Sequence, residues 1–151
     1  MLLKLLLLLH VLGVLVWVGG MFFAHFALRP AVAALPPPER LKLMEDVLGR
    51  FFRLVAMAVL VILVSGFWMI GEMGGMKGVG RYVHWMMLLG LVMTALFGHI
   101  RFVLYKRLQQ AVAAADWPLA ATALGKVRQW VLINLGLGVV TVVVALLRLP
   151  T

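Results

Sequence analysis

The four histidines of this chain are the residues best suited to bind a metal ion or a metal-containing cofactor. They are His10, His25, His84 and His99, and the two members of each successive pair are 15 residues apart. An imidazole nitrogen is a common metal ligand and a frequent axial ligand of haem iron. The chain has no cysteine, so thiolate metal sites, disulfides and cysteine nucleophiles are excluded.

Each histidine pair lies inside one long apolar run. Hydrophobic residues make up 65% of the chain and charged residues 13%, whereas a soluble domain is about half apolar and about a quarter charged. Four runs are long enough to cross a hydrocarbon core of about 30 Å, and they cover residues 5–28, 51–70, 82–104 and 130–147. The sequence therefore predicts an all-α integral membrane protein, a four-helix bundle that forms a single transmembrane domain over residues 1–151.

The connections carry the charge and predict the topology. The formal net charge is +9, and because the charges lie between apolar runs, lipid headgroups explain them better than nucleic acid does. The first and third connections with their flanks hold ten basic residues: Arg29, Arg40, Lys42, Arg50, Arg53, Arg101, Lys106, Arg107, Lys126 and Arg128. The other side holds four: Lys4, Lys77, Arg81 and Arg148. The positive-inside rule then predicts two longer cytoplasmic connections and both termini outside, in a multi-pass protein of a bacterial inner (cytoplasmic) membrane.

Two helix starts are predicted within these connections. A helix begins near Pro38 and either lies along the membrane surface or extends the second span inward. Asp116, just before Trp117 and Pro118, is a helix N-cap.

Helix geometry indicates how the histidines are paired. Fifteen residues of α-helix rise roughly 22 Å and leave a net rotation of about 60°, so both histidines of one span lie broadly on one face. The first and third spans cross the membrane in the same direction. We therefore expect His10 to face His84 near the outer side and His25 to face His99 near the inner side.

Two facing imidazoles suit the two axial positions of a haem iron. Small residues beside the histidines would leave room for a porphyrin: Gly13, Ala24, Ala95 and Gly98. Cations lie where propionates would emerge: Arg29, Arg53 and Arg101 on the inner side, and Lys4 and Arg81 on the outer side. Copper stays an alternative, because ten methionines supply the soft thioethers that select Cu(I).

Several short motifs resemble those of a known family. They are His10 followed by Trp17-Val18-Gly19-Gly20 and Arg29-Pro30, then Gly49-Arg50-Phe51-Phe52-Arg53, Tyr82-Val83-His84 and Gly98-His99-Ile100-Arg101. In these motifs the chain resembles the copper-resistance D (CopD) superfamily and, within it, the HemJ-type protoporphyrinogen oxidases. The resemblance implies a bundle of four or more spans and an association with copper uptake, haem binding or haem biosynthesis. Met86 stands where the HemJ-type pattern has a lysine, which disfavours oxidase activity.

The sequence thus predicts a b-type membrane cytochrome. It would bind two haems b by bis-histidine ligation and pass electrons across the bilayer, with a quinone or a redox protein as the partner. A HemJ-type protoporphyrinogen oxidase with one haem and a CopD-like copper transport or binding protein are the alternatives. Whether the protein is an enzyme, and whether it forms a homodimer, stays open.

Overall fold

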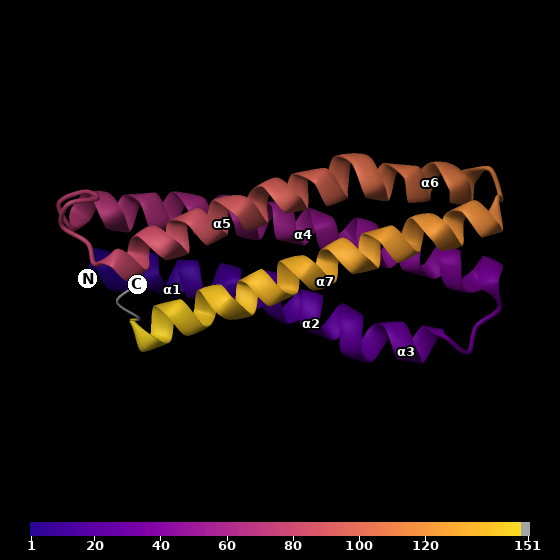
Figure 1. Ribbon diagram of the computed structural model, residues 1–151, viewed down its shortest axis with the longest axis horizontal. Coiled ribbons are helices and arrows are strands. Elements are labelled where there is room, and N and C mark those ends of the chain that lie inside the picture. The colour runs from indigo at the N-terminus through magenta and orange to yellow at the C-terminus, as the bar shows by residue number, and fades with distance from the viewer. Residues whose placement is uncertain (149–151) are drawn as a thin grey trace.

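The computed structural model describes residues 1–148 and consists of four long helical segments (Figure 1). The first is made of α1 (Leu2–Val14), η1 (Leu15–Gly19), α2 (Gly20–Phe23), η2 (Ala24–Leu28) and α3 (Arg29–Val32). The second is α4 (Pro37–Glu72); the third joins α5 (Arg81–His99), η3 (Ile100–Leu104) and α6 (Tyr105–Ala113); the fourth is α7 (Trp117–Leu147). Each segment is long and apolar enough to cross a membrane, and residues 1–148 contain no strand. The predicted all-α membrane fold is confirmed.

The helices are longer than the apolar runs. The 36 residues of α4 span about 54 Å, well beyond a hydrocarbon core of about 30 Å. Because α4 is continuous from Pro37, the charged segment after Pro38 extends the second span and is not a separate surface helix. Asp116 caps α7 as predicted, since its Oδ1 accepts the Leu119 N–H at 3.1 Å. Hydropathy detects only the apolar part of such a helix. It therefore predicts that α4 and α7 begin later in the sequence, and that the third segment ends earlier, than the structure shows.

The ends of the segments are arranged as the charge pattern predicts. Figure 1 shows the start of α1, the end of α7 and the α4–α5 turn at one end of the bundle, with the α3–α4 and α6–α7 connections at the other. Gly74 and Gly75 make the α4–α5 turn possible because both have positive φ angles, of 88° and 77°. We call the end with the termini the outer end and the opposite end the inner end, following the predicted orientation.

The four segments form two hairpins that are joined most firmly at the inner end. The outer half of the bundle consists mainly of α1 packed on α4 and α5 packed on α7, and at the inner end α4 of the first hairpin contacts α6 and α7 of the second. The buried apolar side chains are concentrated there: Leu41, Met44, Leu48, Phe52, Leu104, Tyr105, Leu108, Leu124 and Val127. The outer half has fewer buried residues, among them Leu6, Ser65 and Val144.

Candidate functional site

His10 is held against the second span by its Nδ1 atom. Nδ1 lies 3.0 Å from the Ile62 carbonyl oxygen and 3.1 Å from Ser65 Oγ. A carbonyl oxygen can only accept a hydrogen bond, so Nδ1 carries the proton and Nε2 keeps its lone pair. Glycines at two positions allow α1 to approach α4 this closely. A Cβ on Gly13 of α1 would overlap Ile62, and a Cβ on Gly66 of α4 would lie 3.2 Å from His10 Cε1.

His84 has the same kind of anchor within its own helix. Its Nδ1 lies 3.3 Å from the carbonyl oxygen of Gly80, which precedes the first turn of α5. In its neutral form, His84 therefore carries its proton on Nδ1 and its lone pair on Nε2, as His10 does. The His84 side chain is exposed on the surface of the bundle. Histidines that ligate metals characteristically donate the other ring N–H to a carbonyl or carboxylate, which fixes the tautomer and the ring orientation.

The inner histidines lie beside π-helical turns. His25 is in η2, and His99 is the last residue of α5 directly before η3. A π turn accommodates one more residue than an α turn and often occurs at functional sites. The predicted rise and rotation hold for His84 and His99, because α5 is α-helical throughout, but not for the first span, where η1 separates His10 from His25. The two histidine pairs have the same spacing in the sequence, but the helix between the two histidines has a different geometry in each pair.

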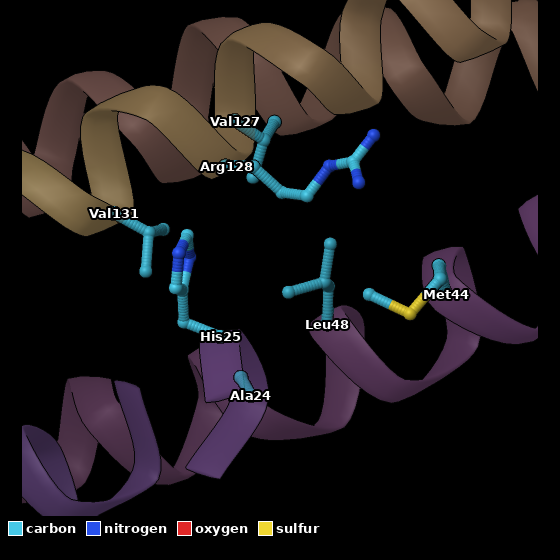
Figure 2. A pocket seen from close by; sticks show the side chains of 7 residues that line it. All are labelled: Ala24, His25, Met44, Leu48, Val127, Arg128 and Val131. Atoms are coloured by element: carbon cyan, nitrogen blue, oxygen red, sulfur yellow. The ribbon is translucent and has the colours of Figure 1, made fainter. Parts of the chain in front are cut away.

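His25 faces a small cavity between the first span, α4 and α7 (Figure 2). Its volume is about 20 Å³, which is room for about one water molecule. The other lining residues are Ala24, Met44, Leu48, Val127, Arg128 and Val131. A porphyrin does not fit in this cavity as it stands.

His99 is exposed, and its imidazole ring packs edge-on against Trp130 of α7, with the ring centroids 5.6 Å apart. The His25 ring packs edge-on against Phe26, with the ring centroids 4.9 Å apart. The described contacts therefore join each histidine to a residue other than histidine. The predicted pairing of His10 with His84 and of His25 with His99 stays a prediction.

The predicted propionate-binding arginines have different surroundings. Arg101 lies over the rings of Phe102 and Tyr105, with its Cζ 5.7 and 5.2 Å from the ring centroids. The charge of Arg53 also acts on Tyr105, and the charge of Arg29 acts on Arg128. Arg81 opens α5 at the outer end and is exposed.

Two of the four small residues that were expected to make room for a porphyrin do leave space. Nothing lies within 4 Å of a Cβ placed on Gly98, and Ala95 is exposed. Gly13, in contrast, is filled by Ile62, so the expectation of an opening there is wrong. Ala24 lines the small cavity beside His25.

The donor chemistry and the space around it decide how well a haem fits. The outer histidines fit, because each has an anchored Nδ1–H and a free Nε2 and neither is fully buried. The inner histidines fit less well, because His25 faces the small cavity and His99 packs on Trp130. Within residues 1–148, no three His, Cys, Asp or Glu side chains form a group that could hold a bare metal ion.

Comparison with protein families identifies the chain. Residues 45–148 match the family described as Copper resistance protein D (CopD). The chain belongs to this family. The resemblance noted in the sequence is thereby confirmed, and the match covers most of α4 and all of α5, η3 and α6, together with α7. It contains His84 and His99 of this CopD protein but not His10 or His25. No curated protein and no solved structure matches the chain.

Sequence reasoning missed the residues that surround the histidines of this CopD protein. Ser65 is the only serine of the chain, and a hydroxyl in an otherwise apolar span commonly bonds across to a neighbouring helix. That signal could have linked α4 to a polar group on another span. Nothing in the sequence indicated that Met44 and Arg128 would share a cavity with His25.

Proposed function

We propose that this CopD protein is a b-type membrane cytochrome that binds haem through its histidines and passes electrons across the bilayer. His10 and His84 would be the axial ligands of an outer haem, and His25 and His99 those of an inner one. Bound haem would supply one-electron chemistry, while the chain supplies ligation, orientation and exclusion of water. A quinone or a redox protein would exchange electrons with it.

The observation that supports this proposal best is the common state of the outer histidines. Both donate Nδ1–H to a backbone carbonyl, at 3.0 Å for His10 and 3.3 Å for His84. Both therefore present Nε2 as the nitrogen free for iron. Ionisable residues within membrane spans are costly and usually have a function, so a purely structural role explains the exposed His84 poorly.

The inner pair makes a weaker part of the proposal. An inner haem would require the cavity at His25 to open and Trp130 to move from His99. The adjacent π turns favour such a change, since a π turn has one surplus residue that the helix can redistribute. The arginines near the inner histidines, Arg29 and Arg101, would then bind propionates.

The test is an optical spectrum and a haem-to-protein ratio for protein purified after expression with ample haem. We expect the absorption of a six-coordinate b-type haem. His10→Ala and His84→Ala should each abolish the outer haem, and His25→Ala and His99→Ala should each remove one haem while leaving the outer one. Leu88→Ala is the matched control, because Leu88 is exposed and lies one turn from His84 on α5.

The outcomes separate three readings. A colourless protein refutes haem binding altogether. One haem per chain that survives replacement of His25 and His99 limits the proposal to the outer site. Oxidation of added protoporphyrinogen by the haem-loaded protein would favour the HemJ-type enzyme over an electron carrier.

Copper binding is a second candidate, favoured by one contact set. His25 and Met44 line the same cavity, and an imidazole with a thioether is a ligand pair that Cu(I) selects. The family description names copper resistance. Against this candidate, Arg128 lines the same cavity and its charge would repel a cation.

Cuprous ion titrated into haem-free protein tests the second candidate. Met44→Leu should then weaken binding, while Met57→Leu should not, because Met57 is exposed on the surface of α4. Equal effects of the two substitutions would argue against copper at His25.

A further inference from the structure

Arg128 is a partly buried cation beside the cavity at His25. It comes from α7, and its guanidinium group extends toward the gap between α7 and the α4 residues Leu48 and Met44 (Figure 2). The charges of Arg29 and Arg40 both act on Arg128. This electrostatic interaction joins arginines from three separate segments, α3, α4 and α7.

Helix register places these arginines around the same cavity. Arg29 follows His25 by four residues, and Arg40 precedes Met44 by four residues on α4. Side chains three or four positions apart share a helix face, and both His25 and Met44 line the cavity. Arg29 and Arg40 therefore lie about one turn from the cavity that Arg128 lines.

None of these three arginines forms an ion pair with a carboxylate in the part of the chain that the structure describes. The ion pair found in residues 1–148 is Arg50 with Asp46, at 3.1 Å on an exposed face of α4. The nearby Glu45 instead accepts hydrogen bonds from Tyr105 and Gln109. Like charges this close repel one another, and partial burial of Arg128 strengthens the repulsion, so the cluster calls for an anion from outside the chain.

We propose that Arg29, Arg40 and Arg128 bind the phosphate of an anionic phospholipid headgroup in the inner leaflet. Arg29 directly follows the first apolar run, and Arg128 lies two residues before the fourth, which puts both at headgroup depth. A guanidinium group binds phosphate oxygens in a bidentate manner. The lipid site shares Arg29 with the proposed inner haem site, so lipid binding is measured on haem-free protein.

The experiment measures binding of fluorescently labelled phosphatidylglycerol to the full chain in neutral detergent micelles. The double variant Arg29→Gln with Arg128→Gln should bind on the order of twentyfold more weakly, from about fivefold for each arginine near a membrane surface. The matched control is Arg107→Gln with Lys126→Gln, which removes the same charge from exposed positions at the same end. At about 0.1 M salt we expect the control to bind within about twofold of the unchanged protein, because exposed charges more than about 10 Å from the bound phosphate are largely screened. Thermal unfolding of both variants verifies that they are folded.

Three results would overturn the proposal. An equal loss in the control variant would mean that the lipid responds only to total surface charge. Complete competition by inorganic phosphate would make this a site for a free anion. Loss of lipid binding on loading with haem would assign the arginines to a propionate. Labelled phosphatidylcholine should bind the unchanged protein more weakly than phosphatidylglycerol, because its choline cation offsets the charge of the phosphate beside the arginines.

Discussion

Tyr105 and Gly49 fit closely at the inner end, and this fit makes a quantitative prediction about stability. Tyr105 is 2% exposed, and its hydroxyl donates to the backbone oxygen and to Oε1 of Glu45, each at 2.9 Å. A Cβ on Gly49 would overlap that hydroxyl oxygen but would lie 3.4 Å from Tyr105 Cζ, an ordinary contact. Gly49→Ala should therefore be harmful only while the hydroxyl is present.

The expected free energies follow from three effects. Alanine in a helix interior is about 1 kcal/mol better than glycine, while overpacking costs about 2 kcal/mol, so Gly49→Ala should lose about 1 kcal/mol. Tyr105→Phe should also lose about 1 kcal/mol through its hydrogen bonds. In the double variant the overlap is gone, so the gain of about 1 kcal/mol offsets the hydrogen-bond loss. The double variant should match the unchanged protein, with a coupling of about 2 kcal/mol.

The assay is unfolding by sodium dodecyl sulfate in mixed micelles, followed by the fluorescence of the five tryptophans. Both single variants should unfold at a lower mole fraction of sodium dodecyl sulfate than the unchanged protein. The double variant should unfold at the same mole fraction as the unchanged protein. If the loss in the double variant equals the sum of the two single losses, the close fit between Gly49 and Tyr105 is refuted.

Three further substitutions test the packing of the spans in the same assay. Asn134→Leu should raise stability by about 1 kcal/mol, because Asn134 is 1% exposed and its Oδ1 has no hydrogen-bond partner; a loss would mean that a bound water or ligand satisfies this oxygen. Gly20→Ala should cost up to about 2 kcal/mol, because overlap of the new Cβ with the Phe51 ring costs about 1–3 kcal/mol and alanine regains about 1 kcal/mol in the helix. Gly19→Ala is its control, because that position is open, and a similar loss there would exclude the clash as the cause. Ala115→Gly should stabilise by about 1 kcal/mol, because Ala115 has a φ of 53°, and an unchanged midpoint would show that this turn relaxes freely.

The sequence was sufficient to predict the four spans, while their direction across the membrane stays a prediction. An apolar run of about 20 residues has few alternatives to a membrane helix, and Asp116 before a proline marks a helix start that the structure confirms. The lengths of α4 and α7 were not predictable from hydropathy, because their inner ends leave the lipid and are buried by other helices instead of by the bilayer.

The surroundings of the histidines were predictable only in part. Helical periodicity indicates which residues share a face, but not which neighbouring helix that face meets. His10 therefore bonds to Ile62 and Ser65 of α4, a contact that its own span could not specify. The π turns were also invisible, because one surplus residue leaves no mark in the apolar pattern of the run that contains His25.

Buried side chains are concentrated at the inner end, so the inner end is tightly packed and the outer half is packed more loosely. Local opening costs least where the fewest apolar contacts are broken. The outer parts of the two hairpins can therefore separate and close again while the inner end stays folded. Under the proposed function, a bulky cofactor would then bind at His10 and His84 after the chain has folded. The cofactor would enter from the outer leaflet, and the chain without cofactor would still be folded.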